Sequence, residues 1–201
     1  MAYIEVKHVT KKIKGRVILD DVNLSLNKGK IYGFVGSNGS GKTMLFRVIS
    51  GLVAPTSGEV CLESNNIGLI IENCSLYPNY TGLKNLMFLA NIRRKIGLDE
   101  VKDALRKVEL NPDDKQTVKK YSLGMKQRLS FAQAIMEKPD ILLLDEPTNA
   151  LDAKGIETIR ELIKQEARRG ATILLASHNP SDIEELCNEV FLVSDGKILR
   201  R

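Results

Sequence analysis

A glycine-rich loop at residues 36–43, Gly-Ser-Asn-Gly-Ser-Gly-Lys-Thr, constrains this chain more than any other feature. It fits the full pattern of a glycine, four residues and Gly-Lys-Ser/Thr, which wraps phosphate groups when a strand precedes the loop and a helix follows. The apolar run Ile31–Val35 predicts a strand covered on both faces. Apolar residues after the loop recur at helical spacing until Gly51, which predicts a helix ending in a left-handed turn. Because a chance glycine-rich turn has no reason to carry both neighbours, we predict a phosphate-binding loop.

The predicted chemistry of the loop follows from its backbone and two of its side chains. Backbone N–H groups of a glycine-rich turn and of a helix N-terminus point at phosphate oxygens. Lys42 is expected to reach the β and γ phosphates of a nucleotide, and the Thr43 hydroxyl is expected to bind Mg²⁺. The expected nucleotide contacts are Gly36, Ser37, Asn38, Gly39, Ser40, Gly41, Lys42 and Thr43.

The composition is that of a globular chain. Of its 201 residues 43% are hydrophobic, which is enough to build one domain over residues 1–201. There is no apolar run of about 18 residues and no signal-peptide pattern at the N-terminus, so we expect a cytoplasmic protein. The net charge of +5 comes from basic residues that are scattered apart from short clusters. Solvated faces explain such clusters more often than RNA or membrane contact does, and we expect no nucleic-acid partner.

The order of the predicted elements is that of an α/β fold. Alternating apolar residues at 4–9 and 22–26 predict an antiparallel β subdomain at the N-terminus. The aliphatic runs 141–144 and 172–176 predict buried strands of a parallel sheet. Helical spacing dominates from about 81 to 137. We therefore predict a parallel core sheet with an α-helical subdomain inserted into it.

Polar residues predict where several helices begin. Thr81 and Ser122 are predicted N-caps, each just before residues with helical spacing. Ser181 and Glu184 have the spacing of a capping box for a short helix near the C-terminus. The Asp-Gly pair at 195–196 predicts a tight hairpin between two strands.

Chemistry on a nucleotide needs a carboxylate that holds a metal ion and a group that activates water. In parallel sheets such groups lie just beyond the carboxyl ends of strands. The predicted strands end at Glu72, at the pair Asp145 and Glu146, and at His178. Adjacent carboxylates can be a solvated strand end and a lone histidine is usually structural. Here, however, buried strands precede both positions, so we predict that they share one site with the loop.

Two further motifs are more specific than the phosphate loop. Residues 121–128, Tyr-Ser-Leu-Gly-Met-Lys-Gln-Arg, come about twenty residues before residues 142–152, Leu-Leu-Leu-Asp-Glu-Pro-Thr-Asn-Ala-Leu-Asp. In this order and spacing the motifs resemble those of the nucleotide-binding domain of ATP-binding cassette (ABC) transporters. The first looks like a variant of that family's Leu-Ser-Gly-Gly-Gln signature. The resemblance covers nearly the whole chain and implies a P-loop NTPase with an ABC-type core.

The resemblance also implies a role for each matching residue. Asp145 matches the aspartate that holds Mg²⁺, and Glu146 matches the carboxylate that polarises the attacking water. His178 matches the histidine that contacts the γ-phosphate, and with Lys42 these residues complete the expected catalytic set. Asp152 matches a loop aspartate that communicates across a dimer.

The signature has a physical logic of its own. Ser122 is expected to cap a helix whose free N–H groups can bind an anion, and Gly124 lets the backbone approach closely. In the family this helix faces the γ-phosphate bound on the other subunit. The resemblance therefore implies a head-to-tail homodimer, or a heterodimer with a related cassette, that sandwiches ATP.

Several positions depart from the common family pattern. Leu123 and Met125 replace the first glycine and the glutamine of the signature, and Ile13 lies where an aromatic residue usually stacks on adenine. Glu72 stands where most members have a glutamine, and we interpret it as a further carboxylate near the metal ion. The variants at 72 and in the signature are similar to those in ATPases of bacitracin-resistance and lantibiotic-immunity exporters.

The resemblance implies an ATPase subunit that uses ATP and Mg²⁺ and drives a separate transmembrane permease from the cytoplasmic face of the membrane. The narrower resemblance implies export of a peptide antibiotic. Leu76, Tyr77 and Tyr80 are expected to contact the permease, unless they belong to the core. The alternative is a non-transport ABC ATPase that acts on the ribosome or nucleic acid. Against it, the chain holds a single cassette, and the interval from 43 to 121 is too short for a long coiled coil.

Overall fold

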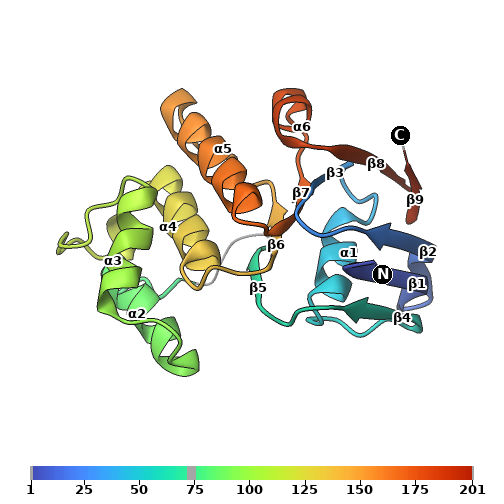
Figure 1. The fold of residues 1–201 in the computed structure, drawn as a ribbon, viewed down its shortest axis with the longest axis horizontal. Helices are drawn as coiled ribbons and strands as arrows, with labels where there is room; N and C mark the ends of the chain where they lie inside the picture. The colour runs from blue at the N-terminus through green and yellow to red at the C-terminus, as the bar shows by residue number, and fades with distance from the viewer. Residues whose placement is uncertain (1, 72–75, 201) are drawn as a thin grey trace.

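The computed structural model describes residues 2–71 and 76–200, which form two β-sheets with helices around them (Figure 1). The larger sheet has six strands in the order β5-β6-β7-β3-β8-β9. They are β3 (Ile31–Val35), β5 (Ile67–Ile70), β6 (Ile141–Asp145), β7 (Thr172–Ala176), β8 (Glu189–Ser194) and β9 (Lys197–Arg200). Neighbouring strands are parallel except for β8 and β9, which are antiparallel. The mainly parallel sheet predicted from the aliphatic runs is confirmed.

The turn between β8 and β9 is the predicted hairpin. Its two residues, Asp195 and Gly196, have positive φ angles of 50° and 76°. Two consecutive left-handed residues match the twist of the strands that they join, which is why an Asp-Gly pair is favoured there.

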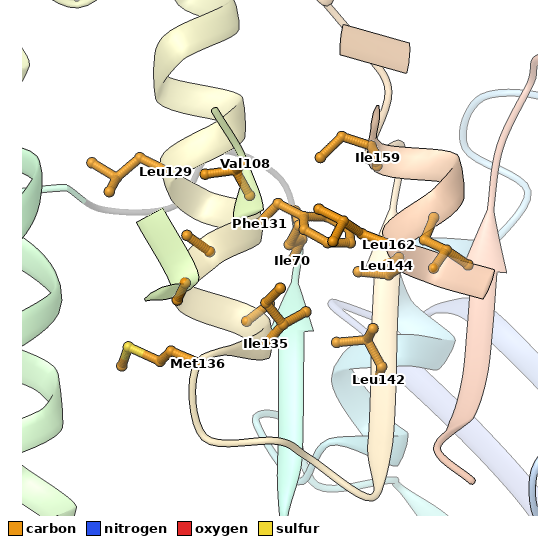
Figure 2. Packing of buried hydrophobic residues seen from close by; sticks show 14 of the residues in the cluster. Ile70, Val108, Leu129, Phe131, Ile135, Met136, Leu142, Leu144, Ile159 and Leu162 are labelled. Carbon is orange, nitrogen blue, oxygen red and sulfur yellow. The ribbon is translucent and has the colours of Figure 1, made fainter. Parts of the chain in front are cut away.

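The two faces of the larger sheet bury different cores. In β6, Leu142 and Leu144 pack into one core while Ile141 and Leu143 pack into the other, because successive side chains of a strand face opposite sides. Helices α4 (Leu123–Ile135) and α5 (Ala153–Arg168) cover the first face. Figure 2 shows the side chains at this contact, among them Phe131, Ile135, Ile159 and Leu162 beside Leu142 and Leu144.

The second core lies between the two sheets. The smaller sheet is antiparallel, in the order β2-β1-β4, and consists of β1 (Ile4–Ile13), β2 (Arg16–Leu26) and β4 (Ser57–Leu62). Helix α1 (Lys42–Ile49) buries Leu45 and Phe46 in this core. The predicted N-terminal antiparallel unit is therefore confirmed, and it packs on the helix that follows the phosphate loop.

Three helices gather at the β5 edge of the larger sheet (Figure 1). They are α2 (Gly82–Arg93), α3 (Leu98–Lys107) and α4, and a short 3₁₀ helix, η1 (Val118–Lys120), precedes α4. Both N-caps predicted in this region are confirmed. The Thr81 hydroxyl accepts a hydrogen bond from Lys84 N at 3.2 Å, and the Ser122 hydroxyl accepts one from Met125 N at 3.1 Å.

The predicted capping box near the C-terminus is wrong. Helix α6 (Pro180–Leu186) is capped by Asn179, whose side-chain oxygen accepts a hydrogen bond from Ser181 N at 3.0 Å. Pro180 is already the first helical residue, because its fixed φ suits that position and its missing N–H is not needed there. The helix therefore begins before the box that Ser181 and Glu184 were expected to form.

Strand order determines what the fold brings together. β6, β7 and β3 are neighbours and run in the same direction, although they are far apart in the sequence. Their carboxyl ends therefore meet at one edge of the sheet, where α/β proteins bind ligands.

Candidate active site

The carboxyl ends of β3, β6 and β7 carry the phosphate loop, Asp145 with Glu146, and His178 respectively. A cavity of about 720 Å³ opens here, lined by residues 38–43, Asp145 and Glu146. The structure therefore brings together the loop and the carboxylate pair, as the sequence predicts. Glu72, predicted to be a further metal ligand, lies outside the described residues.

Glycine is required in the phosphate loop for two reasons. A Cβ at Gly36 would lie 2.2 Å from the carbonyl oxygen of Val193, so the strand β8 leaves no room for a side chain. Gly39 and Gly41 have φ angles of 79° and 115°, which other residues rarely adopt. The loop thus curls tightly at the N-terminus of α1, with its backbone against the neighbouring strand.

Lys42 lies inside this curl. Its ammonium donates hydrogen bonds to the carbonyl oxygens of Gly36 at 2.7 Å and Ser37 at 3.0 Å. The residue is only 8% exposed, so the loop holds a positive charge at the wall of the cavity. Among the described residues, the buried Ser40 hydroxyl has no hydrogen-bond partner. A buried donor without a partner fits a loop that supplies donors to an anion, whose oxygens are the acceptors.

Thr43 and Asp145 meet directly at the floor of the cavity. The Thr43 hydroxyl donates to Asp145 Oδ2 at 2.5 Å, joining the start of α1 to the end of β6. A hydroxyl and a carboxylate are oxygen ligands of the kind that Mg²⁺ takes, usually together with phosphate oxygens and water. The part of the chain that is described holds no group of three or more His, Cys, Asp or Glu residues able to bind a metal ion by themselves. The pair therefore fits a metal that a nucleotide helps to hold.

Glu146 and His178 form the second close contact. His178 Nδ1 lies 2.7 Å from Glu146 Oε2, and their side chains are 67% and 23% exposed respectively. Glu146 has a φ of 52°, an unusual conformation for a residue with a side chain. Its backbone N–H donates to the carbonyl of Ala176 at 2.9 Å, and Gln127 Nε2 donates to its carbonyl at 3.2 Å. Contacts from β7 and α4 therefore hold the backbone that aims this carboxylate.

The cavity also has a wall that the sequence did not predict. Arg16 and Ile18 of β2 line it, whereas Ile13, the position expected beside an adenine ring, is not among the described lining residues. Ile13 and Arg16 are cross-strand partners at the tip of the β1–β2 hairpin. That pairing is the signal that could have pointed to Arg16. Further lining residues are Met44, Arg47, Gln127 and Asn149.

Ser122, Gly124 and Asp152 come together in a different pocket. Its volume is about 650 Å³, and it lies where α4 and α5 begin. A Cβ at Gly124 would lie 3.1 Å from the carbonyl oxygen of Ala150. Asp152 is the N-cap of α5 and accepts a hydrogen bond from Gly155 N at 2.9 Å. The described lining of the first cavity includes none of these three residues.

An ionic cluster supports this signature pocket, by which we mean the pocket lined by Ser122, Gly124 and Asp152. Arg128 of α4 contacts Glu109 at 2.7 Å and Asp152 at 3.4 Å, and Lys154 contacts Glu109 at 2.8 Å. The neighbouring Lys154 and Arg128 lower the pKa of the Glu109 carboxyl below its ordinary value. The cluster ties the helical region to the start of α5.

A phosphate loop opposite strand-end carboxylates, on a mainly parallel sheet, defines a nucleotide-binding domain of the P-loop class. A sequence profile of the ABC transporter family matches residues 19–149, more than half of the chain, and the chain therefore belongs to that family. It is the ATP-binding subunit of an ABC transporter, and as an ABC ATPase cassette it hydrolyses ATP. No helix among the described residues has the length and apolar character needed to cross a membrane.

Relatives and solved structures support this assignment over nearly the whole chain. The ABC transporter ATP-binding protein YybJ of Bacillus subtilis is 45% identical over 97% of this chain and 94% of its own length. The lantibiotic transport ATP-binding protein SrtF of Streptococcus pyogenes is 37% identical over 98% and 89%. The dimeric structure of the cassette MJ0796 bound to ADP and Pi matches with a TM-score of 0.90 at 26% identity, over 98% of this chain and 97% of that one.

Proposed function

We propose that this chain couples the hydrolysis of Mg-ATP to export of a peptide antibiotic through a separate transmembrane permease. One observation carries the chemistry: Thr43, Asp145 and Glu146 line a single cavity, where Thr43 contacts Asp145 at 2.5 Å and Glu146 contacts His178 at 2.7 Å. The class of substrate is supported by SrtF and by the bacitracin transport protein BcrA of Bacillus licheniformis, which is 40% identical over 98% of this chain and 68% of its own length.

The triphosphate lies along the phosphate loop in this proposal. Backbone N–H groups of residues 39–43 and the ammonium of Lys42 bind its oxygens, because they are the donors at the wall of the cavity. Thr43 and Asp145 hold Mg²⁺, whose charge offsets the negative charge of the phosphates. The base points toward Arg16 and Ile18, which line the same cavity from β2.

Glu146 and His178 carry the proposed reaction. Glu146 orients a water molecule so that its oxygen attacks the γ-phosphorus while the bond to the β–γ bridging oxygen breaks, giving ADP and phosphate. His178 is the neighbour that fixes the carboxylate, since the two side chains lie 2.7 Å apart. The exposed part of its ring remains free to bind an oxygen of the γ-phosphate.

The signature pocket acts on the nucleotide of a second copy. Ser122 caps the start of α4, where the backbone N–H groups of the first turn favour an anion. Because the pocket is separate from the cavity of its own chain, a head-to-tail dimer completes both sites. Structures of MJ0796 are dimeric, which supports this arrangement.

An exposed aromatic cluster is the proposed contact for the permease. Tyr77, Tyr80 and Phe88 are 44%, 39% and 50% exposed, and their rings lie close together, with centroids 6.0 Å apart for Tyr77–Tyr80 and 5.1 Å apart for Tyr77–Phe88. Leu76 packs against the core instead. Apolar rings that share a surface favour docking of an amphipathic segment, so this cluster would hold the chain at the cytoplasmic face of the membrane through its partner.

The experiment that tests the transport proposal is a pull-down from detergent-solubilised native cells with tagged Glu146→Gln in the presence of ATP. We expect a polytopic membrane protein among the co-purified chains, identified by mass spectrometry. Adding Tyr77→Ser and Phe88→Ser should remove that protein. Leu199→Ser is the control, because Leu199 is 62% exposed and lies on β9, at the edge of the larger sheet opposite β5. Recovery of ribosomal proteins or nucleic acid without a membrane chain would overturn the transport proposal.

A further inference from the structure

A buried carboxylate that has no role in the chemistry above lies close to the active site. Asp182 of α6 has an exposed fraction of 0%. Its Oδ1 accepts a hydrogen bond from Nε of Arg160 at 2.8 Å and lies 2.7 Å from Nη2 of the same guanidinium in an ion pair. Its Oδ2 accepts hydrogen bonds from the hydroxyls of Thr148 at 2.7 Å and Ser177 at 3.0 Å. Both oxygens of one carboxylate are therefore engaged, by groups from three different segments.

Two of these partners adjoin the proposed reacting residues. Thr148 follows Glu146 by two positions, and Ser177 directly precedes His178. Thr148 and Ser177 are 6% and 2% exposed, and the described lining of the nucleotide cavity includes neither of them nor Asp182. The carboxylate therefore lies on the protein side of the Glu146–His178 pair.

Both segments need such an anchor. Glu146 has a φ of 52°, and a residue with a side chain keeps a left-handed conformation only where its surroundings hold it. The Thr148 hydroxyl fixes the turn that follows Glu146. Beyond His178, the Asn179 backbone N–H donates to the Ser177 hydroxyl at 3.1 Å, so the residues on both sides of the histidine are tied to one point.

We propose that Asp182 is a positioning residue for ATP hydrolysis, which joins the segment that carries Glu146 to the segment that carries His178 and so sets the geometry of that pair. The positive charge of Arg160 balances the negative charge of Asp182. Arg160 Nη1 also pairs with Oε1 of the more exposed Glu185 at 2.7 Å. The inference rests on the proposed roles of Glu146 and His178. Because Asp182 touches neither, it acts only through Thr148 and Ser177.

The test breaks the two links one at a time and leaves the buried Arg160–Asp182 pair intact. In Thr148→Val and Ser177→Ala we expect kcat to fall about tenfold, because small displacements of reacting groups cost large factors in rate. KM for ATP and the Kd of the isolated chain for ATP should stay at the wild-type values, since neither hydroxyl faces the cavity. This split separates positioning from a general loss of structure, which would lower the unfolding midpoint without changing kcat per folded molecule.

Matched controls are available on neighbouring helices. The hydroxyls of Thr158 and Ser130 donate to backbone carbonyls within their own helices, α5 and α4. Thr158→Val and Ser130→Ala make the same chemical changes without touching Asp182, and should keep the wild-type kcat. Glu185→Gln removes the outer partner of Arg160 and should do the same.

A double variant tests whether Asp182 joins the segments. If Asp182 links the Glu146 segment to the His178 segment, loss of either hydroxyl already frees the Glu146–His178 pair. The double variant Thr148→Val with Ser177→Ala should then lose no more kcat than the slower single variant. Losses that multiply would mean two independent effects and would overturn the inference. Asp182→Asn should match the double variant in kcat when corrected for the folded fraction measured by circular dichroism.

Glu146→Gln and His178→Ala are measured in the same series. If both variants lose turnover while Thr148→Val and Ser177→Ala keep the wild-type kcat, only the inference about Asp182 fails. If Glu146→Gln itself keeps wild-type turnover, the proposed catalytic role fails and the inference fails with it. The two failures are therefore distinguishable.

Discussion

The nucleotide cavity and the signature pocket are formed by different parts of the fold, the first by strand ends and the second by helix starts. The cavity lies at the ends of three adjacent parallel strands, and its side chains bond one another directly, as Thr43 does to Asp145. The signature pocket lies at the starts of two helices, where Ser122 and Asp152 cap backbone groups and Arg128 pairs with Asp152 and Glu109. The first region has its reacting groups prearranged, while the second offers helix N-termini to something that its own chain does not hold. In the proposed head-to-tail dimer, this difference would let one fold carry two complementary halves of a site.

The largest expected effect is on the rate of ATP hydrolysis, when Glu146 of the nucleotide cavity is replaced. Glu146→Gln keeps the shape of the side chain but removes the charge that orients water, so hydrolysis should fall by about 10² or more. Binding of ATP to the isolated chain should be unchanged, measured by calorimetry beside a phosphate-release assay. A Glu146→Gln chain that fails to bind ATP would show that the two functions of the cavity are not separable.

Changes in the signature pocket should act on the nucleotide of the second copy in the proposed dimer, rather than on the nucleotide of their own chain. Ser122→Ala and Gly124→Val should lower hydrolysis by about tenfold while the isolated chain binds ATP normally, because these residues serve the partner's nucleotide. Thr81→Ala is the matched control for the lost helix cap, since Thr81 caps α2 and is not among the described lining residues of either pocket.

Mixing makes this comparison sharper. A Lys42→Ala chain has an intact signature pocket, and a Gly124→Val chain has an intact phosphate loop. Combining the two impaired proteins should raise hydrolysis above the sum of their separate activities, because mixed dimers contain one site with both halves intact. No recovery in the mixture, with mixed dimers demonstrated by a tag on one chain, would contradict a shared site.

A smaller effect is expected from Arg16, which lines the cavity from β2. Arg16→Ala should raise the Kd for ATP by about two- to fivefold, because a guanidinium plane beside a purine contributes a modest stacking and cation–π attraction. Tripolyphosphate has no base, so its affinity should not change. Lys14→Ala at the same hairpin tip is the control, since Lys14 is absent from the described lining of the cavity. An equal loss for tripolyphosphate would assign Arg16 to the phosphates instead.

The sequence predicted the features that local patterns encode. The phosphate loop, the parallel strands around it, the caps at Thr81 and Ser122 and the hairpin at 195–196 all depend on residues close together in the chain, and the structure confirms them. The start of α6 was missed because Asn179, the observed cap, competed with an equally plausible cap, Ser181, two residues further on.

Features that depend on distant partners escaped prediction for a physical reason. Asp182 lies in a helix segment with the acidic residues Glu184 and Glu185, and nothing in that spacing distinguishes a buried carboxylate from a solvated one. Its burial follows from Arg160, Thr148 and Ser177, which only the packing of α5 and α6 on the sheet brings together. Arg16 was likewise hidden, because its place in the cavity depends on how the β1–β2 hairpin lies over α1.

The smallest expected effect concerns the ions that support the signature pocket. The pKa of Glu109 is lowered by Lys154 and Arg128, so its carboxylate contributes stability above the unfolded pKa and loses that contribution as pH falls through the folded pKa. Glu109→Gln should lower the free energy of unfolding at pH 7 by under about 1 kcal/mol, because the side chain is partly exposed and screened. The difference from wild type should shrink as pH falls through the lowered folded pKa of Glu109, and disappear once the carboxyl is protonated in both the folded and the unfolded state. Glu161→Gln removes a more exposed pair with Arg168 and serves as the control. If Glu109→Gln also left the mixed-dimer rescue intact, the ionic cluster would support the helices rather than the shared site, and the signature pocket would depend mainly on its caps.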